Sequence, residues 1–430
     1  MSNKIVTTPP LSITPLVSVE NVYKAKVRLK SVALHTPLMP NLNWSEKYDC
    51  NIFFKREDLQ VVRSYKIRGA YNKMSFVPQE ALDKGVVCAS AGNHAQGVAL
   101  ACRLLGVKGT IFMPSTTPKQ KTMKVQFFGR ENVEIVLIGD TFDASSQAAM
   151  AYCEEHNKTF IHPFDDEKVI EGQATVGLEI LEDCDVAIDY VFVAIGGGGL
   201  AAGLGSFFKQ VSPKTKIIGV EAVGAPGMYE SLKAGKAITL AKIDNFVDGV
   251  AVKKVGDITF SICQQVLDDI ILVPEGKICT TILELYNEEA IVAEPAGAIT
   301  ITALDFYKEK IKGKNVVVVI SGGNNDITRT EEIKERSLLY EGLKHYFIIK
   351  FPQRAGALRE FLTNVLSETD DITHFEYVKK NSRSSGPALV GIEFKETKDY
   401  EPMMRRMKEN GIDYESLNDD PMMYGFLIRP

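Results

Sequence analysis

The pattern of apolar and polar positions between about residues 50 and 325 predicts short strands that alternate with helices. Apolar runs rich in β-branched residues are typical of buried parallel strands, and they occupy residues 52–55, 86–90, 110–113, 133–138, 191–195, 216–221 and 315–320. Segments of helical periodicity lie at 67–76, 93–105, 118–128, 142–156, 200–210 and 281–288. This alternation predicts an α/β fold with helices on both faces of a sheet.

After residue 326 the pattern changes to a charged stretch at 329–336, which predicts a helix and then a linker. The remaining elements are predicted as a strand at 345–351, a helix at 358–366, strands at 372–379 and 388–394, a helix at 400–407 and a short strand at 412–414. This βαββαβ order predicts a small α+β domain. We therefore expect a large body at 1–328 with a subdomain at about 55–160, a linker at 329–343 and a C-terminal domain at 344–430.

Composition and charge exclude several classes of protein. The chain has 430 residues, of which 45% are apolar and 24% charged, and its net charge is −5, which is typical of globular proteins. Lysine and arginine are dispersed, so neither nucleic acid nor an anionic membrane is expected as a partner. No window approaches the roughly 20 apolar residues that span a bilayer, and the first thirty lack a secretory signal. Seven scattered cysteines without a C-x-x-C pair indicate reduced thiols, and we expect a cytoplasmic protein.

The junction after the predicted strand at 191–195 carries a run of glycines. The residues that follow Ile195 are Gly196, Gly197, Gly198, Gly199 and Leu200. Four glycines let the backbone turn sharply and aim its N–H groups at one anion, and the N-terminus of the following helix also favours negative charge. In open α/β sheets, ligands bind beyond the carboxyl ends of the strands. The junction therefore predicts a phosphate cradle.

The same glycines leave an alternative open. Gly196, Gly198 and Ala201 fit the dinucleotide fingerprint G-x-G-x-x-A, and Glu221 ends the next strand about twenty residues on. That fingerprint normally opens a domain, whereas here it lies beyond residue 190. Other residues must decide between the two interpretations.

A second junction, at the predicted strand 86–90, ends in Ser90, Ala91, Gly92 and Asn93. Small polar residues at the mouth of a helix offer free N–H groups and side-chain donors, which suit a carboxylate or a phenolic oxygen. The alternative is an ordinary helix N-cap made by Ser90 or Asn93.

A third junction follows the predicted strand at 315–320. There Ser321 presents one hydroxyl beside Gly322 and Gly323, which leave room for a flat ligand.

Lys66 lies where the helix at 67–76 is about to start. An isolated lysine at such a place is usually solvated. It has a chemical role only if an aldehyde is present to react with its amine.

Together these segments resemble the serine/threonine dehydratase family of fold type II pyridoxal-phosphate enzymes, which share the fold of the tryptophan-synthase β-subunit. The resemblance implies a catalytic body of two open α/β sheets. The segment S-Y-K-I-R-G-A around Lys66 stands where the family has its cofactor-linked lysine. The segments A-S-A-G-N-H-A-Q-G-V-A, G-G-G-G-L and S-G-G-N-N follow in the family's order, and the resemblance covers about residues 15–326. The segment F-P-Q-R-A-G-A-L at 351–358 resembles the ACT-like regulatory domain of biosynthetic threonine dehydratases.

The resemblance implies a cofactor, a reaction and a set of site residues. Lys66 would hold pyridoxal 5'-phosphate covalently and then take the Cα proton of the substrate. Cofactor-binding roles fall to Asn93, Gly196, Gly197, Gly198, Gly199, Leu200 and Ser321, and substrate-binding roles to Ser90, Ala91 and Gly92. The implied reaction removes water and then ammonia from L-threonine to give 2-oxobutanoate, as the first step of isoleucine biosynthesis. L-Serine would give pyruvate more slowly.

Two departures from related families argue against racemisation and against a divalent cation site. Serine racemases resemble this chain but place a serine where Ala91 stands, so racemisation is disfavoured. Some relatives bind a divalent cation through a glutamate and an aspartate. Here Glu221 matches the first of these, but Gly227 stands at the position of the second, so no metal site is predicted. Glu294 resembles a family position near the cofactor, but a helix-start acid explains it equally well.

The resemblance also implies regulation and assembly. We expect the C-terminal domain to sense isoleucine or valine, the alternative being a domain that only makes oligomer contacts, and we expect a homotetramer. Three competing functions stay open: a catabolic serine/threonine dehydratase, a dinucleotide-dependent oxidoreductase and a non-catalytic amino-acid sensor. The oxidoreductase leaves Lys66, Asn93 and Ser321 without roles, and the sensor does not need the lysine.

Overall fold

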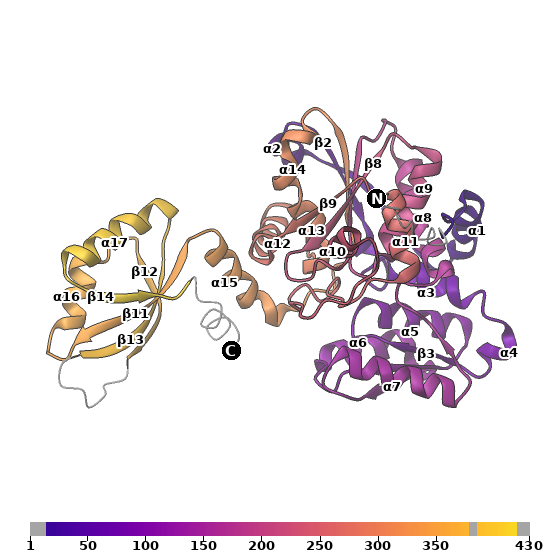
Figure 1. The fold of residues 1–430 in the computed structure, drawn as a ribbon, viewed down its shortest axis with the longest axis horizontal. Helices are drawn as coiled ribbons and strands as arrows, with labels where there is room; N and C mark the ends of the chain where they lie inside the picture. The colour runs from indigo at the N-terminus through magenta and orange to yellow at the C-terminus, as the bar shows by residue number, and fades with distance from the viewer. Residues whose placement is uncertain (1–13, 378–384, 419–430) are drawn as a thin grey trace, which may run out of the picture. The chain divides into compact units, whose positions relative to one another are not determined.

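The structure is a computed structural model that describes residues 14–377 and 385–418 (Figure 1). The chain forms two compact units. The first unit contains the chain up to Pro274 together with Ala290–Asn325, and the second contains Glu275–Glu289 together with the chain from Asp326 onward. The chain therefore leaves the first unit, returns to it and leaves it again.

The larger sheet of the first unit has six strands in the order β1-β2-β10-β7-β8-β9. Their bounds are β1 (Leu38–Asn41), β2 (Asn51–Arg56), β10 (Asn315–Ile320), β7 (Tyr190–Ala194), β8 (Lys216–Ala222) and β9 (Asp269–Val273). All pairs are parallel except β1 with β2. Helices cover both faces of this sheet, so every residue of β7 is buried. A strand that is buried on both faces is apolar nearly throughout.

The smaller sheet of the first unit has four parallel strands in the order β5-β4-β3-β6. Their bounds are β5 (Val133–Leu137), β4 (Gly109–Met113), β3 (Val86–Ala89) and β6 (Thr159–Phe160). This sheet has apolar cores of its own, which include Val86, Cys88 and Ile111. The first unit thus contains two open α/β sheets, as the sequence predicted.

Helices cover both sheets of the first unit. Their bounds are α1 (Val19–Leu29), α2 (Leu42–Tyr48), α3 (Lys66–Met74), α4 (Gln79–Leu82), α5 (Asn93–Leu105), α6 (Lys119–Gly129), α7 (Phe142–Glu155), α8 (Glu167–Asp183), α9 (Gly199–Val211), α10 (Gly227–Ala234), α11 (Asp257–Val266), α13 (Pro295–Thr302) and α14 (Leu304–Ile311). Helices α8, α9 and α11 share one apolar core with β7 and β10. Helices α13 and α14 lie across the large sheet from α8 and α9 (Figure 1).

A buried cluster of charged residues fixes the first turns of α3. The Arg68 guanidinium pairs with Glu57 at 2.7 Å and with Glu179 of α8 at 2.6 Å, and Lys55 of β2 pairs with Glu179 at 2.7 Å. All four side chains are buried, and two cations balance two carboxylates, so no charge is left unpaired in the core. The cluster ties α3 to β2 and α8 close to Lys66.

The second unit contains α12 (Glu275–Glu289) and α15 (Thr330–Tyr340), which pack together, and a sheet in the order β12-β13-β11-β14. Its other elements are β11 (Lys344–Pro352), α16 (Ala357–Asn364), β12 (Asp371–Tyr377), β13 (Ser385–Glu393), α17 (Tyr400–Glu409) and β14 (Asp413–Ser416). All pairings in this sheet are antiparallel. The predicted βαββαβ order is confirmed, although residues 378 and 379 of one predicted strand lie outside the described residues.

Within the ranges 14–377 and 385–418, no helix is long and apolar enough to cross a membrane.

Candidate active site

The tetraglycine turn (Gly196, Gly197, Gly198 and Gly199) and Ser321 lie at the same edge of the large sheet. They follow β7 and β10, which are neighbouring parallel strands with Val317 beside Val191. Tyr65 and Lys66 join this edge, because the Tyr65 N–H donates to the Ser321 carbonyl at 3.2 Å. Two junctions and the lysine, which are far apart in the sequence, therefore lie at one edge of the large sheet.

Lys66 is the first residue of α3, and its side chain is partly buried. Its Nζ donates to the Pro163 carbonyl at 2.9 Å. Burial lowers the pKa of Lys66 to about 8, and the negative charge of Glu294 opposes this effect. A lysine with a lowered pKa has a larger neutral fraction near neutral pH, and only the neutral amine acts as nucleophile or base.

Two histidines lie near enough to Lys66 to respond to its charge. Burial lowers the pKa of His94 to about 3, and the Lys66 charge adds to this effect. Burial also lowers the pKa of His162, again with a contribution from Lys66. His94 bonds the Ile161 carbonyl at 2.9 Å. Both imidazoles are neutral near pH 7, so neither histidine places a positive charge near Lys66.

The tetraglycine turn opens α9 as a cradle of backbone N–H groups. Gly198 is the N-cap residue and has φ of +94°, a left-handed conformation that favours glycine. The first N–H groups of any helix have no partner within the helix, which here concerns Gly199, Leu200 and Ala201. The turn therefore offers several donors and the positive end of a helix dipole to one anion.

Neighbouring side chains hold the tetraglycine turn from behind. The Thr259 hydroxyl donates to the Gly197 carbonyl at 2.6 Å. Because C=O and N–H point in opposite directions across a trans peptide, this bond turns the Gly198 N–H away from Thr259. A Cβ at Gly196 would lie 2.8 Å from the Val250 backbone, and one at Gly197 would overlap the Phe164 ring. Only glycine fits at these two positions.

The Ser90 junction is built differently. The Ser90 hydroxyl accepts the Gly92 N–H at 3.2 Å, a local turn contact. Gly92, not Ser90 or Asn93, is the N-cap residue of α5, and no side chain caps this helix. A Cβ at Gly92 would meet no atom within 4 Å. The turn therefore faces open space, with the uncapped N-terminus of α5 beside it.

Asn93 and Glu294 meet at the centre of the site. The Asn93 Nδ2 donates to Glu294 Oε1 at 2.6 Å, and Asn324 Nδ2 donates to Asn93 Oδ1 at 2.7 Å. Burial raises the pKa of Glu294 to about 7, and the charge of Asp248 raises it further. Glu294 also influences the pKa of Lys66, so its carboxyl belongs to the site.

Glu294 and Asn324 are the residues that the sequence did not assign. Glu294 is the N-cap residue of α13 but makes no side-chain cap there, because its carboxyl reaches Asn93 instead. The available signal was a glutamate before Pro295 in an otherwise small and apolar segment. Asn324 stands in the S-G-G-N-N segment, where only Ser321 was given a role.

Ser321 is buried, and its hydroxyl donates to the Ala296 carbonyl at 3.0 Å. A hydroxyl carries one hydrogen, which rotates to suit its partner. The Ser321 hydroxyl could therefore turn from Ala296 toward a ligand atom at the sheet edge.

Glu221 has a structural role. Its two carboxylate oxygens accept the N–H groups of Met228 and Tyr229, each at 2.8 Å, at the start of α10. Both oxygens are thus engaged, which speaks against Glu221 as the ribose ligand of a dinucleotide site. Among the residues that the structure describes, no group of three or more His, Cys, Asp or Glu residues is arranged to hold a metal ion.

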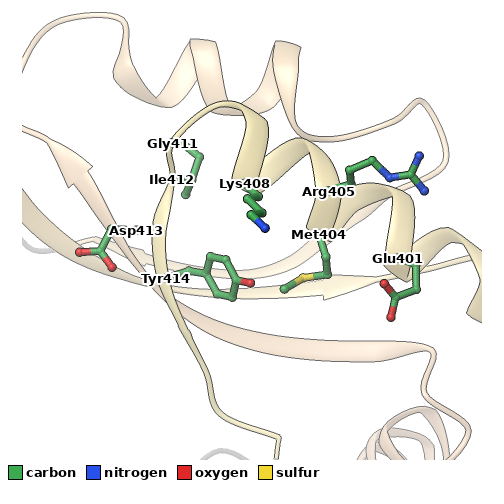
Figure 2. Close-up of a pocket in the computed structure, with 8 residues that line it drawn as sticks. All are labelled: Glu401, Met404, Arg405, Lys408, Gly411, Ile412, Asp413 and Tyr414. Carbon is green, nitrogen blue, oxygen red and sulfur yellow. The ribbon is translucent and has the colours of Figure 1, made fainter.

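The second unit carries an open groove along α17 and β14 (Figure 2). The groove is lined by Glu401, Met404, Arg405, Lys408, Gly411, Ile412, Asp413 and Tyr414. Met404, Ile412 and Tyr414 pack against the core of this unit, whereas the charged residues of the groove are exposed. The groove belongs to the second unit, whereas every predicted site residue belongs to the first.

Comparison with known proteins identifies both parts of the chain. Residues 30–322 match the family described as pyridoxal-phosphate dependent enzyme, and residues 335–427 match the C-terminal regulatory domain of threonine dehydratase. The biosynthetic L-threonine dehydratase of Halalkalibacterium halodurans is 60% identical over 96% of this chain and 99% of that protein. That of Bacillus subtilis is 57% identical over 98% of this chain and 100% of that protein.

A solved structure agrees with these matches. The processed form of threonine deaminase isoform 2 from Solanum lycopersicum is 40% identical, with a TM-score of 0.70, and the match covers 78% of this chain and 99% of that one. The chain belongs to the pyridoxal-phosphate dependent enzymes and, within them, to the family of biosynthetic L-threonine dehydratases.

Proposed function

We propose that this protein converts L-threonine to 2-oxobutanoate and ammonia with pyridoxal 5'-phosphate, and L-serine to pyruvate more slowly. The observation that carries the proposal is the partly buried Lys66 amine, with its pKa lowered to about 8, which directly follows Tyr65, the residue whose N–H donates to the Ser321 carbonyl. The relatives named as biosynthetic L-threonine dehydratases support the substrate.

The residues at the site fit this cofactor. The tetraglycine turn and the first turn of α9 offer backbone donors for a phosphate, and only glycines leave room at Gly196 and Gly197. Asn93 has one amide hydrogen beyond the one given to Glu294, which suits a ring oxygen. When bound, the cofactor supplies an aldehyde that links to amines and a ring that stabilises negative charge at the substrate's Cα.

Lys66 would serve twice, first as the residue that holds the cofactor and then as the base that removes the Cα proton. Its lowered pKa supports both roles, because the amine must be neutral for each. Ser321 would meet the ring nitrogen with a neutral hydroxyl, which brings no charge to hold a proton there. We infer that this favours loss of the β-hydroxyl over transamination or racemisation.

The substrate's carboxylate would lie at the Ser90, Ala91 and Gly92 turn. The uncapped N-terminus of α5 directs free N–H groups and a positive dipole end there. The space in front of Gly92 is open, so a ligand can approach the backbone closely. The turn thus suits a small anion that enters and leaves in each cycle.

We further propose that different parts of the chain have different functions. Residues 1–328 would form the catalytic part with a subdomain at about 55–160, residues 329–343 a linker and residues 344–430 an effector domain for isoleucine or valine. The match to a regulatory domain supports biosynthetic rather than catabolic use. We expect a homotetramer in the cytoplasm, and the seven free cysteines are consistent with a reducing compartment.

The test compares Lys66→Ala with a control on the same helix, Lys73→Ala. Lys73 pairs with Asp166 at 2.6 Å, whereas Lys66 bonds the Pro163 carbonyl. Formation of 2-oxobutanoate and ammonia from L-threonine should fall about 10²–10⁴-fold or more in Lys66→Ala, because proton transfer alone contributes that much. Lys73→Ala should keep nearly full turnover. Turnover retained in Lys66→Ala would contradict the proposal.

A further inference from the structure

The side chain of Asn324 lies between Asn93 and two other groups. Its Nδ2 donates to the Val62 carbonyl at 2.9 Å and to Asn93 Oδ1 at 2.7 Å. Its Oδ1 lies 3.4 Å from the Lys124 ammonium. Asn324 therefore uses both ends of its amide, and one of its bonds reaches a residue of the proposed cofactor site.

The partners of Asn324 determine which way its amide faces. A carbonyl only accepts hydrogen bonds, and an ammonium only donates them. The NH2 group of Asn324 must therefore face Val62, and its oxygen must face Lys124. Its second hydrogen then goes to Asn93, which has to present its own oxygen.

The orientation of Asn93 follows from that of Asn324. With its oxygen turned to Asn324, Asn93 directs its NH2 group to Glu294, and their contact of 2.6 Å fits a donor facing a carboxyl oxygen. One hydrogen of this NH2 group serves Glu294, and the other is left for a ligand. If the Asn93 amide turned over, its NH2 group would face the NH2 group of Asn324, so two donors would oppose each other.

We propose that Asn324 is a positioning residue, which holds the Asn93 amide so that its remaining N–H is directed at the cofactor. This rests on the proposed function, since it takes the ligand at Asn93 to be pyridoxal phosphate. Asn324 need not touch the cofactor, because its effect is transmitted through the bond to Asn93. The backbone carbonyl of the buried Val62 supplies the fixed reference for the whole chain of bonds.

The test measures the dissociation constant of pyridoxal phosphate by titrating cofactor-free protein and following absorbance. Asn324→Ala should raise this constant about five- to tenfold, the effect of losing one orienting hydrogen bond. Asn93→Ala should raise it at least as much. In the double variant, the loss of Asn324 should add nothing to the loss of Asn93, because Asn324 acts through it.

Asn72→Ala is the matched control. Asn72 is a buried asparagine that also bridges two groups, donating to the Lys168 carbonyl at 2.7 Å and accepting from Arg28 at 2.8 Å. Denaturant unfolding of the cofactor-free proteins should show a comparable loss of stability in Asn72→Ala and Asn324→Ala. Only Asn324→Ala should weaken cofactor binding.

Two results would overturn the proposal for Asn324. One is that the effects of Asn324→Ala and Asn93→Ala multiply in the double variant, and the other is that Asn324→Ala binds the cofactor as tightly as the wild type. Failure of the wild-type protein to bind pyridoxal phosphate would be a different result, since it would refute the proposed function itself.

Discussion

The tetraglycine turn and the Ser90, Ala91 and Gly92 turn both join a buried strand to a helix, yet they are supported in opposite ways. Phe164, Val250 and Thr259 fill the space behind the tetraglycine turn, so a side chain at Gly197 would overlap a ring. A Cβ at Gly92, in contrast, would meet no atom within 4 Å. The first turn is fixed by the fold, and the second has room in front of it.

This difference matches two kinds of ligand. A cofactor that stays bound through many cycles is held best by a rigid set of donors, since nothing has to be ordered at each turnover. A substrate that enters and leaves needs an open approach to the backbone. The comparison therefore supports phosphate at the tetraglycine turn and the substrate carboxylate at the Ser90 turn.

The largest effect is expected from Gly197→Ala, which tests the rigid turn. The new methyl group overlaps the Phe164 ring, and overpacking of this kind costs about 1–3 kcal/mol of unfolding free energy. The turn must shift to relieve the overlap, so cofactor binding should weaken by more than about tenfold, which is a loss of about 1.4 kcal/mol. Denaturant unfolding and cofactor titration measure the two effects.

Phe164→Ala provides the control for Gly197→Ala. Because removing the ring makes room for the methyl group, the double variant should be more stable than the sum of the two single effects predicts. Strict additivity would show that the ring does not support the turn.

A smaller effect is expected from Gly92→Ala, which tests the open turn. An added methyl group would meet no atom within 4 Å, but the φ of −125° and ψ of −142° lie outside the favoured regions for alanine, so the free energy of unfolding should fall by about 1 kcal/mol. The KM for L-threonine should rise about tenfold, the low end of what one methyl group contributes to discrimination. Steady-state kinetics measure the KM, and cofactor titration measures the affinity for pyridoxal phosphate. Weakened cofactor binding with an unchanged KM would reverse the assignment of the two turns.

The smallest effect is a change of stability with pH. We expect it only at the Ser90, Ala91 and Gly92 turn, because Asn93, which follows this turn, bonds the titrating carboxyl of Glu294. Glu294 ionises near its ordinary pKa of 4.5 when unfolded and at about 7 when folded. Between these values the folded protein holds more protons, so its free energy of unfolding should fall as pH rises from about 4.5 to about 7 and then level off. Denaturation of cofactor-free protein from pH 5 to 8 measures this slope.

Glu294→Gln should reduce that slope, since the titrating group is gone. Glu221, whose pKa burial raises to about 8, contributes to both proteins and cancels in their difference. Equal slopes in the two proteins would show that Glu294 is ionised throughout.

The sequence predicted most of the strands and the residues at their ends. Ser321 and the tetraglycine turn follow apolar runs whose parallel pairing places them at one edge, so their proximity follows from topology alone. Helix α8 was not predicted, and its buried residues from Val169 to Ile180 include Glu171 and Glu179. Burial of such carboxylates depends on partners far away in the sequence, such as Arg68 for Glu179, which the periodicity of the segment does not reveal.

Glu294 and Asn324 could not be assigned from the sequence for a different reason. Their roles depend on which way two amides face, which is decided by Val62 and Lys124, residues far away along the chain. The pKa of Glu294 is likewise set by burial and by the charge of Asp248, which periodicity does not reveal. Contacts of this kind become visible only when the elements are assembled.

The central claim is tested most directly by the visible absorption spectrum of the purified protein, recorded with pyridoxal phosphate before and after L-threonine is added, with 2-oxobutanoate assayed in the same sample. We predict a yellow protein whose band changes on addition of threonine while 2-oxobutanoate accumulates. A protein that stays colourless with pyridoxal phosphate and forms no 2-oxobutanoate would contradict the roles of Lys66 and of the tetraglycine turn together.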